Sequence, residues 1–593
     1  MALPADAGPT DLPHLRRGWL AVLGGGFAPG ALIGTHLAGL IFFLNPGLPF
    51  APGPVLRGVA AYGALIGAIS LALHLPLTWG RPRRARRILP WSLTLALAAA
   101  ALLDWTQGSY YSYFLPPGIN ERLIKTALWL SLGALIAFYT ALLHTLQRRP
   151  YGIRSRLAYL LVALLSVYAM VERREAFRPR PAPTPRPAAV ETGQRPRLWV
   201  IGIDAATMDA ILPLAGQGRL PFLAAVLQGG AYGRLASFSP TRRDAVWMTL
   251  ATGKYPYKHD IAGRRPYSAD FFTPGAELRL LPMGISFRRW GLLGGHPLPP
   301  GSAVPRALAL WEILPRLGVP AGVVGWPEAA PGSREAAFAL ADRFFNSKEP
   351  GRASVWPEDL AGRAQLLRPH LQELAPAALH GRFGRHASRW LIEALAGDLW
   401  RRSVVLSLAG QNPQAEAAFL LLPGLREVSR RSFGGFSAVQ FEGEPGATDS
   451  ARAAAERLAA YYEQLDTWLA DLWSRGEGPR LLAVVSAYGV DPQGGWRRLW
   501  GRMAPGKALG GEFLDAPDGA ILLYGAGIRP GALVTGARLV DIAPTLLYGL
   551  GFPVARDLDG RVLTAAFDKE FLAENPVTFF PSYEGLARTA AKP

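Results

Sequence analysis

The residue best placed for chemistry is Asp204, which ends the continuous apolar run LWVIGID that begins at Leu198. A run of this kind is typical of a strand buried on both faces of a parallel sheet. Ligands bind such sheets at the carboxyl ends of the strands, so the Asp204 carboxylate is expected to face a site. Carboxylate oxygens are ligands for divalent cations such as Mg²⁺ and partners for Arg.

Cysteine and histidine limit the chemistry further. Cysteine is absent, which excludes disulfides, thiolate metal sites and a Cys nucleophile. No histidine follows His386. The chain has nine histidines, and three of them lie in apolar segments: His36, His74 and His144. An ionisable group in such a segment by default marks a transport pathway or a lipid-headgroup site. A neutral His against a neighbouring Ser, Thr or carbonyl group is the simpler expectation for them.

The elements that would position Asp204 are alternating strands and helices. Short apolar runs recur along the chain after the first strand, at 321–325, 418–422, 481–486 and 520–524. Helical stretches such as 449–473 separate them. This alternation predicts an α/β sandwich around a mostly parallel sheet, with a helix directly after the Asp204 strand.

The first third of the chain has a different character. Five segments approach the roughly 20 apolar residues that a helix needs to cross a bilayer. They run roughly from 19 to 44, 58 to 79, 88 to 104, 126 to 147 and 153 to 171. The third and fifth are short or charged at one end, so four or six spans are also compatible with the sequence. Glycines of the first segment, from Gly24 to Gly34, would allow close helix packing.

Charge predicts the orientation of these spans. Residues 1–196 carry 20 Lys and Arg against 7 Asp and Glu, whereas residues 197–593 carry 43 against 37. Arginines cluster before the first span and after the second and fourth, and such clusters stay in the cytoplasm. The N-terminus is therefore expected in the cytoplasm, and five spans at 1–171 then put the domain at 198–593 outside, in the periplasm or the extracellular space. A Pro/Arg-rich linker at 172–197 joins the two parts. Because the basic excess surrounds the spans, no nucleic-acid partner is expected.

Five motifs resemble, in order, the alkaline phosphatase superfamily, specifically its type I phosphodiesterase and nucleotide pyrophosphatase branch. They are VIGIDAATMDAI, LPFLAAVLQGGAYGRL, WMTLATGKYPYKHDI, LWEILPRLGVPAGVVGWPEAAP and LVDIAPTLLYGLGFPVARDLDGRVL. The resemblance covers nearly all of residues 198–565 and implies an alkaline-phosphatase-like domain there, joined to the helical membrane region that the apolar segments predict. Family chemistry uses two divalent ions, such as zinc, to activate a Thr or Ser nucleophile.

The ligands that the resemblance implies are mostly absent. Six side chains hold the metals in the family, and only Asp204 matches. Arg243 stands where the nucleophile belongs, and the REVSR segment has Arg426 and Arg430 where the family has an Asp and a His. In SAYG, Ala487 and Tyr488 replace an Asp-His pair. Phe513, Leu514 and Asp515 occupy the candidate positions for the last His.

The leading hypothesis is therefore a membrane-anchored pseudoenzyme, with no catalytic residue, no metal and no cofactor. Its sharper form is an anion pocket built from Asp204, Arg243, Arg426, Arg430 and Tyr488; the alternative is a collapsed network in which Asp204 and the arginines neutralise one another. Expected partners are membrane lipids, an anionic ligand and a membrane protein, whose complex the protein would help to assemble.

A second hypothesis is an active, metal-dependent phosphodiesterase or lipid-headgroup phosphotransferase with an atypical site. It would draw on Asp204, Thr241, Asp244 or Asp260. Clustered carboxylates near Asp204 would favour this hypothesis, and clustered arginines would oppose it.

Overall fold

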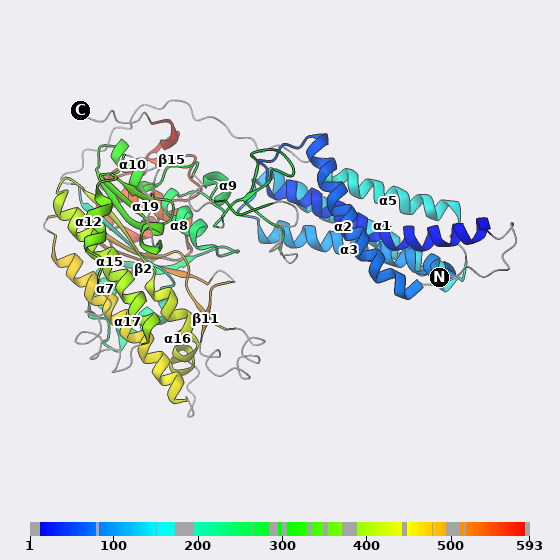
Figure 1. Ribbon diagram of the computed structural model, residues 1–593. Coiled ribbons are helices and arrows are strands. Elements are labelled where there is room, and N and C mark those ends of the chain that lie inside the picture. The colour runs from blue at the N-terminus through cyan, green and yellow to red at the C-terminus, as the bar shows by residue number, and fades with distance from the viewer. Residues whose placement is uncertain are drawn as a thin grey trace. The chain divides into compact units, whose positions relative to one another are not determined.

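A computed structural model describes most of the chain (Figure 1). The described residues are 12–78, 82–149, 151–171, 195–263, 265–283, 295–298, 305–329, 335–347, 354–369, 388–441, 448–476, 478–493, 510–514 and 517–586. The chain divides into two compact units. The helical unit combines Met1–Pro179 with Arg264–Ser302, and the α/β unit combines Arg180–Gly263 with Ala303–Pro593. The segment Arg264–Ser302, called the excursion below, lies in the sequence range of the α/β domain but belongs to the helical unit.

Five long helices build the helical unit. They are α1 (Leu12–Leu44), α2 (Pro52–Thr78), α3 (Pro82–Tyr110), α4 (Pro117–Leu146) and α5 (Ile153–Val171). Four stretches are long and apolar enough to cross a membrane: Val22–Leu44, Pro52–Thr78, Arg87–Tyr110 and Pro117–Leu146. All five predicted spans are thus helices, and the 19-residue α5 is the one outside this set of four.

Small residues allow α1 and α2 to pack closely. A Cβ atom on Gly30 would lie 2.4 Å from the Ile66 carbonyl oxygen, and one on Gly34 would lie 2.2 Å from that of Tyr62. Ser70 Oγ donates a hydrogen bond of 2.7 Å to the Gly26 carbonyl. Close backbone approach and a hydroxyl bond across helices are the interactions that hold helices together in lipid.

Two of the histidines in the predicted spans have hydrogen-bond partners within the helical unit. His36 Nδ1 lies 2.8 Å from the Leu32 carbonyl oxygen, one turn earlier in α1. His144 Nε2 lies 2.8 Å from Ser155 Oγ, and the ring stacks on Tyr151. His74 is buried, and its Nε2 has no hydrogen-bond partner among the described residues.

The α/β unit is built on a sheet of ten strands in the described part of the chain, ordered β13-β2-β12-β9-β1-β8-β5-β6-β7, with β14 beside β2. The strands are β1 (Arg197–Ile203), β2 (Ala231–Ala236), β5 (Ala321–Trp326), β6 (Phe338–Ala341), β7 (Val355–Trp356), β8 (Ala417–Leu422), β9 (Arg480–Ser486), β12 (Gly519–Gly525), β13 (Ala532–Leu533) and β14 (Ala537–Arg538). The central strands β9, β1, β8, β5 and β6 are parallel. All five predicted strands are present, although β12 runs antiparallel to both β9 and β2.

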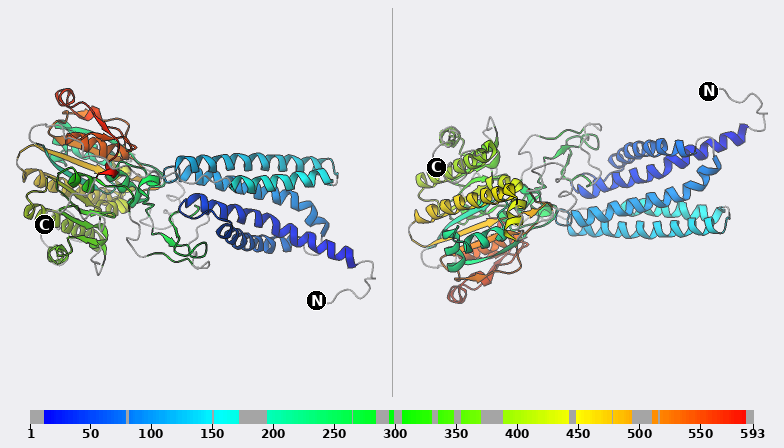
Figure 2. Two further views of the ribbon diagram at one scale, coloured as in Figure 1. Left: turned by 90° about the horizontal axis from the view of Figure 1, so that it is seen from above. Right: turned by 90° about the horizontal axis from the view of Figure 1, so that it is seen from below.

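The α/β unit also contains helices, several of which contact strands of this sheet (Figure 2). They are α6 (Met208–Gly216), α7 (Pro221–Gly229), α8 (Arg243–Thr252), α9 (Pro256–His259), α10 (Leu310–Arg316), α11 (Asp342–Asn346), α12 (Leu360–Leu366), α15 (Arg389–Gln411), α16 (Gly424–Gln440), α17 (Asp449–Ser474), α19 (Ile542–Gly549) and α20 (Lys569–Glu574). The remaining short strands pair as β3 (Tyr267–Ser268) with β4 (Glu277–Leu278), β10 (Asp491–Pro492) with β11 (Gly511–Glu512) and β15 (Val554–Ala555) with β16 (Phe579–Phe580). Because β1 is parallel to both β8 and β9, Asp204, the start of α16 after β8 and the end of β9 lie at one edge of the sheet.

Candidate functional site

Asp204 lies at the carboxyl end of β1, and its carboxylate is completely buried. Its backbone N–H continues the ladder to the Leu422 carbonyl at 3.0 Å, after which Ala205 turns the chain with a positive φ of 64°. The Ser486 hydroxyl at the end of β9 accepts a 3.0 Å hydrogen bond from the Ala206 N–H and so fixes this turn. Strained backbone of this kind is concentrated at functional sites.

Both oxygens of the Asp204 carboxylate accept a hydrogen bond from α8. Trp247 Nε1 donates to Oδ1, and Arg243 Nε donates to Oδ2 at 2.5 Å. Trp247 reaches β1 because Gly202 has no side chain: a Cβ there would lie 2.9 Å from the indole ring. Arg243, which the resemblance aligns with the family's nucleophile, is therefore bonded to Asp204, the residue predicted to match a metal ligand.

Arg243 bridges Asp204 to a second buried carboxylate. Its Nη1 donates to Asp342 Oδ2 at 2.9 Å, while its Nη2 is buried without a hydrogen-bond partner among the described residues. Burial lowers the pKa of Arg243, but the charges of Asp204 and Asp342 outweigh it and the net shift is upward. Arg243 is thus a permanent cation held between two anions.

Asp342 begins α11 directly after β6, and Arg401 of α15 is its second cationic partner, with Nη2 at 2.9 Å. Burial raises the pKa of Asp342, but Arg243 and Arg401 more than offset this and hold it below its ordinary value. Sequence reasoning missed this pair. The apolar run FALAD carries the same signal for Asp342 that LWVIGID carries for Asp204.

Two further acids surround the bridge. Asp244 follows Arg243, and 39% of its side chain is exposed. Partial burial raises its pKa to about 6, and the charges of Asp342 and Asp204 act in the same direction. The charges of Arg243 and Arg426 oppose this shift. Burial also raises the pKa of Glu328 to about 7, with Arg343 opposing it from 3.3 Å. The site therefore combines four carboxylates with several guanidinium groups.

Tyr488 closes the site from the β9 side. Its side chain is buried, and its hydroxyl forms no well-formed hydrogen bond with the described residues. Burial and the Asp204 charge raise the pKa of Tyr488, opposed by Arg426 and Arg243. The Tyr488 ring meets Phe513 edge-on with centroids 5.8 Å apart, and the exposed Arg426 guanidinium lies 5.0 Å from the centroid of the same Phe513 ring.

The structure therefore brings Asp204, Arg243 and Tyr488 together, with Arg426 beside them across Phe513. Arg430 is separate: it is half exposed and pairs with Glu427 at 2.7 Å on its own helix. Of the residues considered for an atypical enzyme, Thr241 has a buried hydroxyl without a hydrogen-bond partner in the described residues, and Asp260 pairs with Arg306 at 2.6 Å. Asp515 lies outside the described residues.

Comparison with known proteins assigns the α/β region. Residues 198–493 match the family model described as type I phosphodiesterase / nucleotide pyrophosphatase. This region belongs to that family. No curated protein matches the chain. The family predicted from the sequence is therefore confirmed, on a match that ends before the last of the five motifs at residues 539–563.

Solved structures similar to the type I phosphodiesterase region include two phosphonate hydrolases and a phosphatase. Phosphonoacetate hydrolase from Sinorhizobium meliloti 1021 is 14% identical with a TM-score of 0.32, and the match covers 52% of this chain and 61% of that one. Phosphonate monoester hydrolase from Silicibacter pomeroyi is 16% identical over 63% of this chain and 78% of that one, with a TM-score of 0.36. Alkaline phosphatase PafA is 11% identical over 64% of this chain and all of that one, with a TM-score of 0.40.

The residues present do not fit the two divalent ions that type I phosphodiesterases use. Both Asp204 oxygens are engaged, one by a guanidinium at the distance of a close ion pair. Among the described residues, no group of three or more His, Asp and Glu side chains could hold a metal ion.

His259 is buried between Thr249 and the Ile261 N–H, and this burial lowers its pKa to about 3.

Proposed function

We propose that this protein is a membrane-anchored pseudoenzyme of the type I phosphodiesterase family that acts by binding an anionic group or by assembling a membrane complex. The observation that carries the proposal is the Arg243 bridge between Asp204 and Asp342. A guanidinium keeps its charge at all physiological pH values and offers planar donors, so it can replace a metal as an anchor for anions. It cannot activate a nucleophile.

Unsatisfied donors support the anion-binding form of the proposal. Arg243 Nη2 and the Tyr488 hydroxyl are buried without well-formed hydrogen bonds among the described residues, which is costly unless a further group completes them. Arg426 adds an exposed guanidinium held against Phe513. A tetrahedral oxyanion such as phosphate or a phosphonate offers acceptors for all three donors. The competing form, a closed salt-bridge network, leaves Arg243 Nη2 and the Tyr488 hydroxyl without partners among the described residues.

The test is phosphate and methylphosphonate binding by the full-length protein in detergent, measured by calorimetry. Arg426→Gln should weaken binding by about 10-fold to 100-fold, the scale of one lost hydrogen bond to a charged group. Arg430→Gln is the matched control and should leave the affinity unchanged, because Arg430 is paired with Glu427. No binding to the unmodified protein would leave complex assembly as the function.

One observation favours the second candidate, an atypical phosphodiesterase or headgroup phosphotransferase. The charge of Asp342 raises the pKa of both Asp244 and Glu328, so three carboxylates lie near Asp204, although the described residues do not form a group that could hold a metal ion. Arginines already neutralise Asp204 and Asp342, which is why the pseudoenzyme is preferred. Turnover of a phosphodiester substrate with added Mg²⁺, Mn²⁺ or Zn²⁺ would decide for the enzyme.

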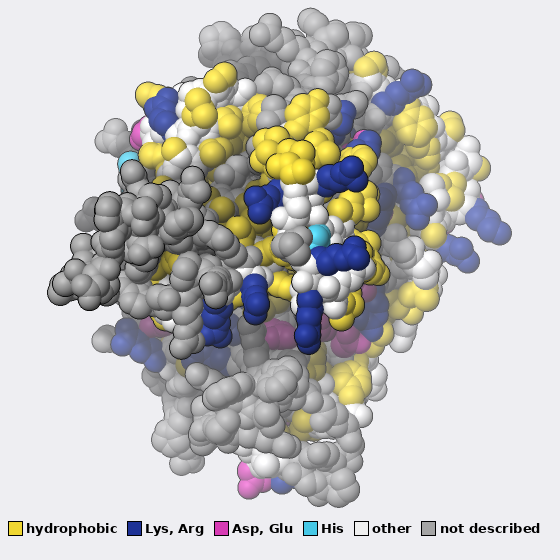
Figure 3. Space-filling model, turned by 90° about the vertical axis from the view of Figure 1, so that its right-hand side faces the viewer, with side chains coloured by type: hydrophobic (Ala, Val, Ile, Leu, Met, Phe, Trp, Pro, Cys, Tyr) yellow, Lys and Arg dark blue, Asp and Glu magenta, His cyan; other side chains and the backbone are white. Residues whose placement is uncertain are grey.

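We further propose that the four or five apolar helices sit in the cytoplasmic membrane with their Arg-rich end inside and the α/β domain outside. At that end α2 and α4 stop and α3 and α5 start, and basic side chains surround it (Figure 3). Exposed arginines there are Arg84, Arg87, Arg148, Arg149, Arg154 and Arg156. Short loops rich in Arg stay in the cytoplasm. Lipids and a membrane-protein partner would then contact the helices.

A further inference from the structure

The excursion Arg264–Ser302 leaves the α/β unit and returns to it at one place. The Arg306 N–H donates to the His259 carbonyl at 3.0 Å, and Arg306 Nε pairs with Asp260 at 2.6 Å. The residues that precede the excursion and those that follow it are therefore bonded to each other. As a result the chain passes between its two compact units three times, near residues 179, 263 and 302.

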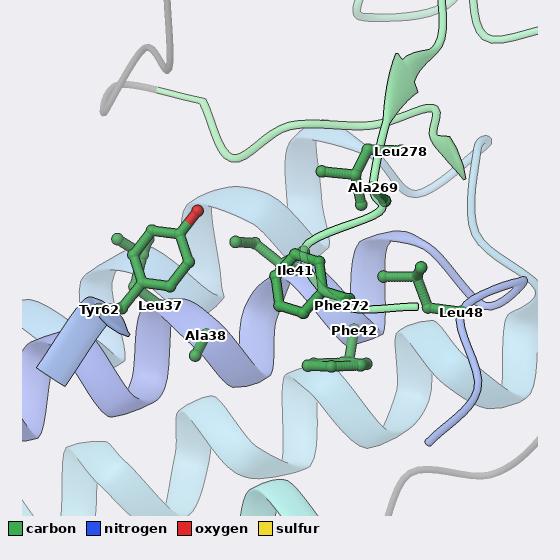
Figure 4. Packing of buried hydrophobic residues seen from close by; sticks show 9 residues of the cluster. All are labelled: Leu37, Ala38, Ile41, Phe42, Leu48, Tyr62, Ala269, Phe272 and Leu278. Atoms are coloured by element: carbon green, nitrogen blue, oxygen red, sulfur yellow. The ribbon is translucent and has the colours of Figure 1, made fainter. Parts of the chain in front are cut away.

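Apolar side chains of the excursion are buried among the helices of the helical unit. Phe272, Ala269 and Leu278 form one cluster with residues of α1, α2 and the loop after α1, shown in Figure 4. The Phe272 ring is completely buried and meets the Phe42 ring edge-on at 5.3 Å. A Cβ on Gly58 would lie 2.9 Å from the Phe272 ring, so α2 provides a position for it. Burying a whole aromatic ring is among the larger contributions a single side chain makes to an interface.

Two buried amides of the helical unit bind the main chain of the excursion. Asn45 Nδ2 donates to the Leu280 carbonyl at 2.8 Å, and its Oδ1 accepts from the Arg279 and Leu280 N–H groups at 2.7 and 3.0 Å. Gln107 Nε2 donates to the Met283 carbonyl at 3.0 Å, and its Oε1 accepts from the Met283 N–H at 2.8 Å. Each amide thus pairs both main-chain groups of one residue, as a neighbouring strand would.

A third polar contact extends this recognition. The Tyr111 hydroxyl donates to the Leu281 carbonyl at 2.9 Å. Gln107 is completely buried and Asn45 almost so. Without the excursion, Asn45 Oδ1 and both polar atoms of the Gln107 amide would lose these partners, and Asn45 Nδ2 would keep only its bond to the Ile41 carbonyl at 2.9 Å. A polar group that loses its partner in a buried position costs more than an exposed hydrogen bond contributes. The helical unit is therefore built to hold an extended segment at this position.

We infer that the helical unit is a docking site for residues 265–283 of the same chain, and that this docking anchors the α/β domain independently of the linker. The occupant is the excursion itself, recognised through an aromatic anchor and through its main chain. Cutting the linker should therefore leave two pieces that stay associated. The inference does not depend on whether the α/β domain binds an anion or hydrolyses a substrate.

The experiment places a specific protease site in the linker between residues 176 and 190 of the full-length chain, with an affinity tag on the N-terminus. After cleavage in a mild detergent, most of the C-terminal piece should remain on the resin with the helical piece. The double variant Asn45→Leu/Gln107→Leu should release it at least about tenfold faster, because two buried amide pairs are lost. Gln147→Leu, an exposed amide at the other end of α4, is the matched control and should behave as the unmodified protein.

A second variant tests the inference independently, in case the double variant misfolds. Replacing residues 264–302 by a short Gly/Ser connection keeps the base closed by Asp260 and Arg306 and removes the docked segment. After linker cleavage this variant should separate completely. Retention of the C-terminal piece by this variant, or separation of the unmodified pieces, would overturn the inference. Because the chain lacks cysteine, Phe42→Cys with Phe272→Cys also allows cross-linking in membranes, which should join the two pieces.

Discussion

Replacing Arg243 tests whether the salt-bridge network holds the domain together. In Arg243→Gln the completely buried Asp204 keeps only its bond from Trp247, and Asp342 keeps Arg401. Removing one partner of a buried ion pair costs about 3–5 kcal/mol, since the other charge stays buried. The free energy of unfolding at pH 7 should fall by that amount.

Arg430→Gln is the control for this comparison. Arg430 is half exposed and pairs with Glu427, so its loss should cost at most about 1 kcal/mol. Denaturant unfolding of both full-length variants in detergent, followed by Trp fluorescence, measures the difference. Arg243 and Arg401 hold the pKa of Asp342 below its ordinary value, so their stabilisation is present above pH ~4 and is lost below it. The gap between the variants should narrow in acid. A gap of less than about 1 kcal/mol at pH 7 would refute the view of Arg243 as a structural cation.

Four further predictions follow from the site and the helices. Asp244→Asn should stabilise the protein more at pH 8 than at pH 5, because the pKa of Asp244 is raised to about 6 and its ionised form is the disfavoured one; denaturant unfolding at both pH values measures this. His259 should stay neutral from pH 8 to pH 5 in a proton NMR titration, because burial lowers its pKa to about 3. Arg243→Thr should give no metal-dependent phosphodiesterase turnover, and elemental analysis of the unmodified protein should find zinc well below one ion per chain. Single cysteines should be labelled in intact cells in the linker, and only in permeabilised cells in the loop of residues 81–87.

Each of these has a contrary result. Equal effects of Asp244→Asn at both pH values would mean that its carboxyl titrates normally, and a His259 signal that shifts near pH 6.5 would mean that the ring is solvated. Turnover by Arg243→Thr, or stoichiometric zinc, would favour the enzyme hypothesis. Linker labelling only after permeabilisation would reverse the proposed orientation.

Much of the fold follows from local patterns. Each predicted strand is a short apolar run, because central strands of a parallel sheet are buried on both faces. The antiparallel direction of β12 could not be read in the same way, because a buried strand has the same pattern in either direction. The helix 449–474 was predicted almost to its ends, since Thr448 caps it and apolar residues recur on one face.

The site was only partly predictable. Asp204 and Arg243 followed from strand-end position and family motifs, and Asp342 carried a strand-end signal of its own. The role of Arg401 could not be predicted, because Arg401 and Arg402 are neighbours in one helix. Tertiary packing alone pairs Arg401 with Asp342 and Arg402 with Asp471. Arg430 stands one helical turn after Arg426, but its side chain pairs with Glu427 three residues before it, a local contact that the helix spacing allows. Choices of partner between elements distant in sequence leave no local pattern.

The way in which Asn45 and Gln107 hold the excursion bears on how this protein can evolve. Both amides bind main-chain atoms, which every residue supplies, so these bonds do not depend on which side chains stand at positions 279, 280 and 283. Proline is the exception at these three positions, since it has no N–H to donate. It already stands at 282, where no N–H is used. Burial still restricts Leu280 to an apolar residue. Among homologues we expect fixed amides on the helices, apolar residues at the positions of Leu278 and Leu280 and a bulky aromatic residue at the position of Phe272, with variation at the exposed Met283.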